Sequence, residues 1–511
     1  MDKFSNNANV ARLQIPVSDK NVTSELSGDF VLPDYQPEIK RLLRIGASVL
    51  PPSKYIGERE GELAGSLDYY VYYVGSDDMP YCAPITTEYK ISVPLERDDE
   101  ETGGFLSELY ADALISPDMI SGRVTAPRKL SIKCRLKSRV QIFGCMPLED
   151  GYSHGEDGLQ VLRGKMTSSE YLRGASDLLH VTDEMICDSR DGEVRVVSAE
   201  GKTLFSEVGS VDNAVVCRGD LYVKLLLCRE EEGTLYTALR KMPFSTTVAV
   251  EGVKRGDSAS ARGSVCEMSV TVEDGRIGID GGMIIEAQVA HSDEVEYVKD
   301  VYSTGRRCAN GYKTIDLPRS AICFGGNFTL SDSMTLEEGG IAHGARIVDT
   351  GGSATVEEYS FDGDKCSVTG KAKFALLTEK DGEFGTCEIE LPFTYRTGAP
   401  DASHASCSCE VVSVRAKADG ERVGIDAEIG VSGSAYRLER ESLLSEAAFG
   451  DEIGGARGEI VVCYPSDSDS LWSVAKRYGA DFERLRSANG ISADISPDAK
   501  ESLENVNFLV I

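Results

Sequence analysis

The residues best suited to chemistry in this chain are few and scattered. The segment HASCSC places His404 close to Cys407 and Cys409. A Cys-x-Cys pair in a strand would direct both sulfur atoms to one face of a sheet. Zinc sites need four ligands, and no fourth ligand stands at a suitable spacing, so we interpret the segment as a strand with small buried residues and predict no metal.

Two other arrangements suggest catalysis or nucleotide binding. The acid pairs Asp77-Asp78 and Asp98-Asp99 could act as glycosidase carboxylates, but their charge-rich surroundings indicate solvated turns. Lys202 lies in a Gly-Lys-Thr triplet, but Val196 stands where a phosphate-binding loop needs its first glycine. We therefore predict no catalytic residue and no cofactor, and expect that the protein is not an enzyme. A hydrolase is the alternative if folding brings distant carboxylates together.

Composition narrows the classes of partner. The chain has 511 residues, with 84 acidic and 54 basic side chains and a formal net charge of -30. We therefore expect no nucleic-acid partner, because a nucleic acid carries the same sign of charge. The N-terminus lacks the apolar core of a signal peptide, and no run of about 18 apolar residues occurs, so we expect a cytoplasmic chain without membrane insertion. The 14 cysteines contain no C-x-x-C pair, which favours reduced, buried thiols.

The elements that would position these residues are mostly strands. Segments 129–143, 219–228 and 370–379 alternate apolar and polar residues, and charged glycine turns separate such runs. This pattern predicts antiparallel hairpins of half-buried strands. Segments 34–47 and 103–116 instead carry leucine and isoleucine at helical spacing, the first after Pro37, and we predict helices there. The predicted fold class is mainly β with minor helix.

Three landmarks recur about every 150 residues in the same order, which indicates a tandem repeat. They are centred on Asp34, Asp183 and Asp332, on Gly65, Gly219 and Gly370, and on Ile132, Ile279 and Ile425. We predict three β-rich repeat domains, each long enough to fold as a separate bead, although one large β protein with accidental similarity would be an alternative. The predicted boundaries are 1–165 with the N-terminal segment, 166–308, 309–449, a Gly-rich linker over 450–458, and a C-terminal domain over 459–511.

The C-terminal domain has a different pattern. Apolar residues at Leu471, Val474, Ala475 and Tyr478 predict an amphipathic helix, which Asp469 or Ser470 would cap and Gly479 would end. A second helix would run from Asp481 to Asn489-Gly490, and the apolar runs 460–463 and 508–511 would add two strands. The predicted unit is therefore βααβ, and we expect its structural core to contain Trp472, Ala475, Tyr478 and Leu485.

The stretch DSLWSVAKRYGADFERLRSANGI, residues 469 to 491, resembles the LysM family in the order of its aspartate, leucine, tryptophan, alanine, tyrosine-glycine and alanine-asparagine positions. LysM modules bind N-acetylglucosamine-containing glycans such as peptidoglycan. The resemblance implies a ligand or partner groove between two loops, formed by Asp469, Ser470, Leu471, Asn489, Gly490, Ile491 and Ser492. Ser468 replaces the usual family glycine, and would be strained if the loop required a positive φ there. Alternatively, Asp469 and Asn489 serve only as helix caps.

The whole chain also resembles the SipL-like SPOCS-domain proteins of endospore-forming bacteria, through its LPDYQPEI start, its β-rich repeats with a proline-phenylalanine segment, and its C-terminal LysM-like stretch. That resemblance implies a non-catalytic spore-coat scaffold in the mother-cell cytoplasm, at the forespore or spore coat surface. The implied partner is a coat morphogenetic ATPase of the SpoIVA-like kind or another spore-coat protein, with self-association as a further expectation. A glycan-binding protein of the spore cortex or cell wall is the alternative.

Overall fold

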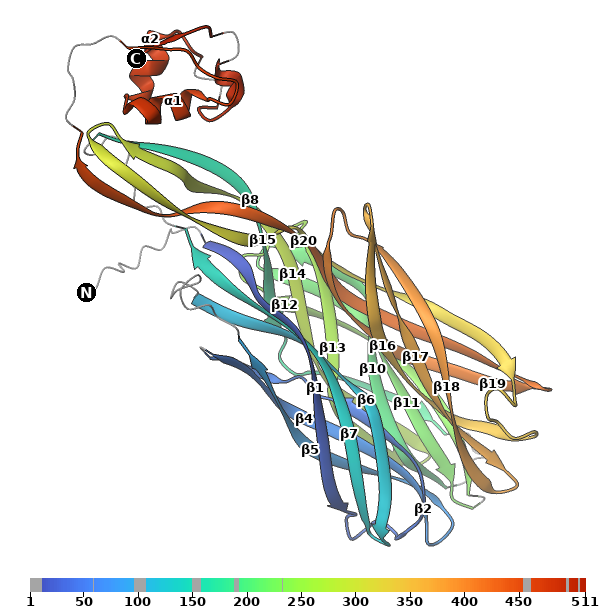
Figure 1. The fold of residues 1–511 in the computed structure, drawn as a ribbon. Helices are drawn as coiled ribbons and strands as arrows, with labels where there is room; N and C mark the ends of the chain where they lie inside the picture. Colours follow the sequence, from blue (N-terminus) through green and yellow to red (C-terminus); the bar gives the residue numbers. More distant parts are fainter. Residues whose placement is uncertain are drawn as a thin grey trace.

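The structure is a computed structural model that describes residues 12–57, 59–95, 107–148, 158–187, 193–231, 233–453, 461–492, 496–503 and 506–511. Antiparallel strands dominate it, and the two α-helices that it describes both lie near the C-terminus (Figure 1). The predicted fold class, mainly β with a small βααβ end, is therefore confirmed.

One arrangement of strands occurs three times along the chain, and we call each occurrence a repeat unit. The first sheet of each unit has a long central strand that pairs on both sides. In order of the units, these first sheets contain β1 (Arg12–Val31), β7 (Lys129–Pro147) and β6 (Ser107–Ala126); β8 (Leu159–Ala175), β9 (Leu179–Ile186), β14 (Arg276–Ser303) and β13 (Ser258–Glu273); and β15 (Arg306–Thr335), β20 (Arg422–Glu452) and β19 (His404–Asp419).

The second sheet of each unit is a meander that lies between the strands of the first sheet in sequence. These second sheets contain β2 (Ile39–Val49), β3 (Ser53–Ile56), β4 (Glu60–Gly75) and β5 (Pro80–Pro94); β10 (Val194–Val211), β11 (Ala214–Arg229) and β12 (Thr234–Ala249); and β16 (Arg346–Asp362), β17 (Lys365–Lys380) and β18 (Glu383–Gly398). In each unit a buried apolar cluster draws on both sheets, so the two sheets pack face to face as a sandwich.

Cross-strand register explains why the sequence landmarks recur. Asp183 lies opposite Ile279, and Asp332 lies opposite Ile425. In the first unit the residue opposite Ile132 is Gly28. Asp34 therefore does not occupy the position that Asp183 and Asp332 share; that position lies six residues earlier in the sequence. The remaining two landmarks keep the same structural position in all three units.

The recurrent glycine leaves room for an aromatic ring. Gly65 lies opposite Tyr89 and Gly370 opposite Phe393, and both rings are buried. A Cβ atom would lie 2.7 Å from Tyr89 Oη in the first case and 2.6 Å from Phe393 Cζ in the second. The absence of a side chain lets the ring of the facing strand lie across the backbone, which is a positional reason for glycine in a strand.

The helix predicted over 34–47 is wrong, because residues 39–49 form strand β2. Register shifts occur between Ile39 and Arg41 and again after Leu42. Each β-bulge inserts an extra residue, so Ile39, Leu42 and Ile45 all face the same cluster although they are three residues apart. Two bulges thus reproduced the spacing of a helix in a strand.

The helix predicted over 103–116 is also wrong where the structure describes it, since β6 begins at Ser107; residues 103–106 lie outside the described part. β6 likewise has register shifts between Ser107 and Tyr110 and between Pro117 and Met119. Ala111 and Ile115 pack on the core of the first unit, and Leu114 lies outside that cluster. Apolar residues on both faces of the strand removed the alternation that would have predicted it.

The three units pack directly against one another, and the expectation that each folds as a separate bead stays a prediction. Phe143, Tyr171 and Tyr436 come one from each unit and form a triangle of edge-to-face rings with centroids 5.8 to 6.2 Å apart. At a second junction the buried carboxylate of Asp349 in unit 3 pairs with Arg44 of unit 1 and, at 3.1 Å, with Lys224 of unit 2. The domain boundaries at 165/166, 308/309 and 449/450 stay predictions; those positions fall within β8, β15 and β20.

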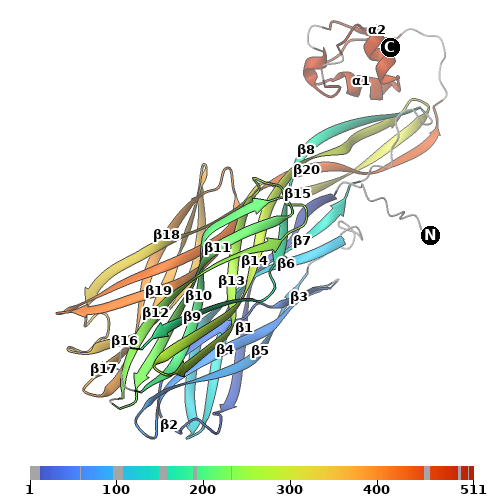
Figure 2. The ribbon, with the colours of Figure 1, turned by 180° about the vertical axis from the view of Figure 1, so that it is seen from behind.

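Four strand ends extend beyond the sandwiches as an arm. The arm consists of the start of β8, the end of β14, the start of β15 and the end of β20, and Figures 1 and 2 show it reaching the C-terminal module. Leu159 and Val301 pack with Leu444 inside the arm. The arm therefore combines strands of units 2 and 3 and ends next to α1 and α2.

Candidate functional site

The C-terminal module covers residues 461–511 and has the predicted order strand, two helices, strand. It contains β21 (Val462–Cys463), α1 (Leu471–Tyr478), α2 (Phe482–Ala488), the 3-10 helix η2 (Lys500–Leu503) and β22 (Leu509–Val510). β21 and β22 pair in antiparallel register. The helices cover the sheet through one buried cluster that includes Leu471, Phe482 and Leu509.

The first loop of the predicted groove is held by a helix cap. Ser470 is the N-cap of α1, where its Oγ atom accepts a hydrogen bond of 3.2 Å from Ser473 N. Ser473 Oγ accepts one of 2.9 Å from Ser470 N in return. Reciprocal bonds of this kind satisfy backbone donors that a helix start leaves unpaired. Ser470 and Leu471 are both buried, so this part of the loop is used for folding.

Asp469 does not cap the helix but joins the loop to the far end of α1. Its Oδ2 atom accepts hydrogen bonds from Ser466 N at 2.9 Å and Ser466 Oγ at 3.0 Å. Its other oxygen pairs with the Arg477 guanidinium. The hydrogen bonds from Arg477 and then from the Ser466 backbone lower the pKa of Asp469 to about 2, so the carboxylate is ionised at neutral pH.

The second loop is closed by Asn489, the C-cap of α2. Its Nδ2 atom donates to Leu485 O at 2.8 Å and to Val510 O at 2.9 Å, while its Oδ1 atom accepts from Val510 N at 2.8 Å. Asn489 therefore holds α2 to β22. Gly490 follows with φ of 64°, in the left-handed region that favours glycine.

Exposure differs between the two loops. Asp469, Ser470 and Leu471 are buried, Asn489 and Ile491 are half-buried, and Gly490 and Ser492 are exposed. Leu471 and Ile491 pack in the same apolar cluster, which brings one residue of each loop together. The surface that this pair of loops offers to a ligand comes mainly from the second loop.

Three of the four predicted core residues are buried. Trp472 is 5% exposed, Ala475 0% and Leu485 3%. Tyr478 is 44% exposed and lies outside the cluster, so its assignment to the core is corrected. Helix α1 has only eight residues, and Tyr478 is the last of them. Gly479, the C-cap with φ of 62°, ends the helix at this point, beyond the residues that pack on the sheet.

Comparison with known families gives one match. Residues 468–499 match the LysM domain. The matched range includes both helices and both loops of the predicted groove, and the C-terminal module is from here on called the LysM domain. No curated protein and no solved structure matches the chain significantly.

Ser468, the position that departs from the usual LysM glycine, is not strained. It is absent from the described non-glycine residues that have positive φ. Its Oγ atom lies 3.0 Å from Ser466 Oγ on the exposed side of the loop. The conformational cost expected for serine therefore does not arise, and this residue gives no reason to exclude a ligand.

The LysM domain packs on the arm through Trp472. The indole Nε1 atom donates a hydrogen bond of 2.8 Å to Asp300 Oδ2 at the end of β14. The Tyr302 ring meets the indole edge-on at 4.9 Å, and Tyr302 Oη donates to Ala480 O at 2.8 Å. Both Tyr302 and Leu162 of the arm belong to the buried cluster of the LysM domain.

The Asp300 carboxylate accepts several hydrogen bonds at this contact. Lys476 Nζ lies 2.6 and 2.8 Å from its two oxygens, and Tyr312 Oη and Asn310 Nδ2 each donate at 2.6 Å. Burial alone would raise the pKa of Asp300, but the hydrogen bonds from Lys476, Tyr312 and Trp472 lower it. The carboxylate is therefore ionised and can hold the indole and the ammonium together.

A further contact reaches α2 from strand β8. Gln160 Oε1 accepts a hydrogen bond of 3.1 Å from Phe482 N, at the first residue of the helix. Sequence reasoning missed Gln160, Asp300 and Tyr302 because more than 150 residues separate them from the helices that they contact. Contacts between such distant segments leave no local pattern in the sequence, so nothing indicated that the ends of β14 and β8 would meet a helical module.

The other segments singled out for chemistry are structural. His404 stacks on Tyr436 with centroids 5.3 Å apart, and the sulfur atoms of Cys407 and Cys409 lie 4.0 Å from each other in β19. Across the described ranges no group of three or more metal-binding side chains comes together. All 14 cysteines lie in the described part of the chain, and none of them forms a disulfide.

Asp77 of the first acid pair and Lys202 of the Gly-Lys-Thr triplet have partners within the fold. Asp77 Oδ1 accepts a hydrogen bond from Met79 N within a turn, while Asp98 and Asp99 lie outside the described residues. Lys202 lies in strand β10 and pairs with Glu410 at 2.6 Å. The helices that the structure describes are too short and too polar to span a bilayer.

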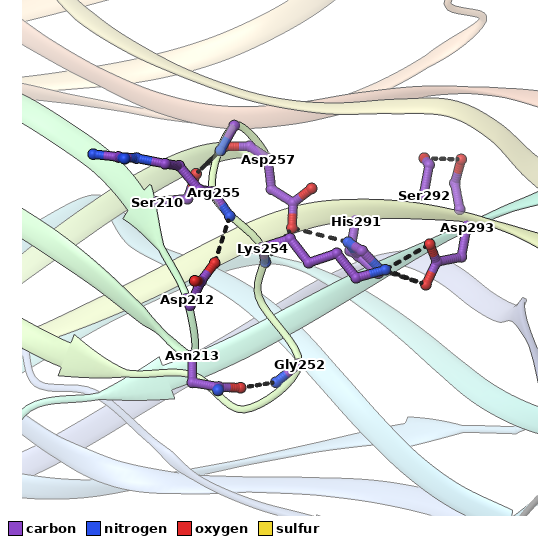
Figure 3. Close-up of polar contacts among 12 residues, drawn as sticks. Ser210, Asp212, Asn213, Gly252, Lys254, Arg255, Asp257, His291, Ser292 and Asp293 are labelled. Carbon is purple, nitrogen blue, oxygen red and sulfur yellow. Dashed lines mark hydrogen bonds and ion pairs between the residues drawn. The ribbon is translucent and has the colours of Figure 1, made fainter.

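Among the histidines that the structure describes, His291 is the most buried, and both of its ring nitrogens have partners. His291 Nδ1 lies 2.9 Å from Asp257 Oδ2, and its Nε2 lies 2.9 Å from Asp293 Oδ2 (Figure 3). Burial alone would lower its pKa, but hydrogen bonds to Asp293 and Asp257 raise it. Because both ring nitrogens are occupied, this imidazole clamps the loop before β13 to β14 and is not available as a general base.

Proposed function

We propose that the LysM domain binds an N-acetylglucosamine-containing glycan such as peptidoglycan, and that it attaches the three repeat units to that polymer. The observation that carries this proposal is the match of residues 468–499 to the LysM domain. The exposed residues Gly490 and Ser492, beside the half-buried Ile491, would provide the contact surface. The buried first loop would support the second loop through the packing of Leu471 with Ile491 in one apolar cluster.

The arm would keep the binding loops oriented. The contacts of Asp300, Tyr302 and Gln160 engage Trp472, Ala480 and Phe482, and none of these six residues belongs to the predicted groove. A glycan could therefore bind while the LysM domain stays on the arm. This arrangement suits a protein whose LysM domain presents its binding loops in one orientation at the end of the arm.

Sedimentation with purified, insoluble peptidoglycan tests the proposal in the full chain. We expect the wild-type protein in the pellet. Ser492→Tyr should leave it in the supernatant because a large ring would cover the second loop. Ser487→Tyr is the matched control, since Ser487 is exposed on α2 outside the groove. If neither the wild type nor Ser468→Gly sediments, glycan binding is excluded.

A second candidate is a non-catalytic spore-coat scaffold whose LysM domain docks a protein, such as a coat morphogenetic ATPase of the SpoIVA-like kind. The observation that favours it is the burial of Asp469, Ser470 and Leu471, which leaves a sugar few polar groups in the first loop. The chain would then work in the mother-cell cytoplasm at the forespore surface. A pull-down of the purified ATPase by the full chain tests it, and retention that Ser492→Tyr does not weaken would contradict docking at this groove.

A further inference from the structure

A basic recess lies where the three repeat units meet. It has a volume of about 150 Å³ and adjoins a larger cavity of about 1520 Å³ that strands of all three units line. The charged side chains that line the recess are Lys54 and Asp112 of unit 1 and Arg173, Arg262 and Glu286 of unit 2. Three cations therefore face two carboxylates.

The two carboxylates are already engaged. Asp112 is 4% exposed, and its Oδ1 atom pairs with Arg262 Nη2 at 2.6 Å. Glu286 Oε1 lies 3.6 Å from Lys54 Nζ. Asp112 Oδ2 is 3.5 Å from Arg173 Nη2, which is an ion pair without a hydrogen bond. The charge of Arg173 is thus only partly balanced within the recess.

Arg173 is the group that lacks hydrogen-bond partners. Its Nε, Nη1 and Nη2 atoms are all buried and make no hydrogen bond, and its guanidinium lies 4.8 Å from the centre of the Tyr110 ring. A guanidinium presents five donors in a planar fork, and leaving buried donors unpaired costs free energy. The fork is shaped to hold two oxygens of a carboxylate or a phosphate.

We propose that this recess binds one small oxyanion, of the phosphate or carboxylate type, on the Arg173 guanidinium. The anion would supply the missing acceptors and balance the extra positive charge, with Lys54 and Arg262 beside it. Ser432 of unit 3 also lines the recess, so the bound anion would touch all three units and lock their packing. This site is separate from the LysM domain and does not depend on the function proposed for it.

Isothermal titration of the full chain with inorganic phosphate and, separately, with acetate in a chloride buffer tests the proposal and distinguishes the two anion types. We expect saturable binding at one site per chain. Arg173→Met should weaken it by roughly tenfold or more, the loss expected for a charge-assisted hydrogen bond. Arg319→Met is the matched control, because Arg319 is also buried with unpaired nitrogens but lies outside the recess.

A second variant, for which we expect tighter binding of the anion, keeps the test decisive if Arg173→Met does not fold. Asp112→Asn removes the competing carboxylate, so the anion should bind more tightly and should raise the melting temperature of the variant more than that of the wild type. Absence of saturable heat with both anions would mean that water alone fills the recess and would overturn the proposal. Binding that Arg173→Met leaves unchanged would overturn it as well.

Discussion

Trp472 Nε1 donates a hydrogen bond to Asp300 Oδ2 across 172 residues of sequence, and this bond joins the LysM domain to the end of strand β14. Asp300 also holds Lys476, and the Tyr302 ring covers the edge of the indole. The domain therefore completes the burial of its tryptophan with residues of repeat unit 2.

This contact can be followed by fluorescence, because Trp472 is the only tryptophan in the chain. We expect Asp300→Ala to shift the emission to longer wavelength and to destabilise the docked state by about 1 to 3 kcal/mol, since the buried indole N–H of Trp472 and the half-buried Lys476 ammonium lose their acceptor. Asp316→Ala, an exposed carboxylate on β15, is the control. An unchanged emission spectrum in Asp300→Ala would show that the indole is held by the LysM domain alone.

We expect Asn489 to contribute to the stability of the LysM domain and not only to its binding surface. Asn489→Ala removes one hydrogen bond to Leu485 O of α2 and the two side-chain hydrogen bonds to the Val510 backbone of β22. We predict a loss of about 1 to 3 kcal/mol in the stability of the LysM domain. Urea unfolding monitored at Trp472 measures it. A variant with wild-type stability but no glycan binding would assign Asn489 to the ligand site instead.

The glycine landmark gives a prediction for the repeat units. A Cβ atom at Gly370 would lie 2.2 Å from Thr355 O and 2.6 Å from Phe393 Cζ, so Gly370→Ala must displace the strand or the ring. We expect a loss of about 1 to 3 kcal/mol. At Gly424, also in a strand of unit 3, nothing lies within 4 Å of the added atom. Calorimetry should therefore show Gly424→Ala close to the wild type, and equal melting temperatures for both variants would refute the steric explanation.

His291 predicts a dependence of stability on pH. Its pKa in the folded protein is above its ordinary value of about 6.5, because Asp293 and Asp257 stabilise the imidazolium against the effect of burial. The stabilisation is therefore complete below about pH 6.5 and is lost as the pH rises through the folded pKa. Lys254, which pairs with Asp293, and Glu170 on the neighbouring strand are the other charged groups that face this cluster.

Urea midpoints of the wild type and His291→Gln between about pH 5 and pH 9 measure this effect. The wild type should be the more stable protein at the acidic end, and the difference should shrink toward the alkaline end. A difference that grows with pH would mean that the neutral imidazole is the bonded form. The nuclear magnetic resonance titration of His291 gives its pKa independently.

The sequence was sufficient to predict elements whose signals are local. Alternation predicted the strands, and the cap at Ser470, the turn at Gly479 and the helix start at Asp481 all occur where the residue types favour them. Bulged strands were missed, because two extra residues in β2 give Ile39, Leu42 and Ile45 the spacing of a helix. Local spacing cannot distinguish a helix from a strand with two bulges.

The candidate site was predictable only where its residues follow a local pattern. The loop residues follow from the LysM pattern, but their exposure does not, since Asp469 is buried by its bond to Arg477 and Tyr478 is exposed at the end of a short helix. Asp300, Gln160 and Arg173 act through contacts between distant strands. Such contacts depend on how the three units pack, which no short stretch of sequence determines.

The length of β14 has a mechanical consequence. Its 28 residues extend over roughly 90 Å, from the hairpin turn before Arg276 to Ser303, and Asp300, which holds Trp472, lies near the far end. A load applied to the LysM domain would pull along β14 and β20, so the ladders beside them would be sheared lengthwise and many hydrogen bonds would have to break at once. If the LysM domain holds a polymer as proposed, this arrangement would oppose a pull on the domain with the combined hydrogen bonds of both ladders.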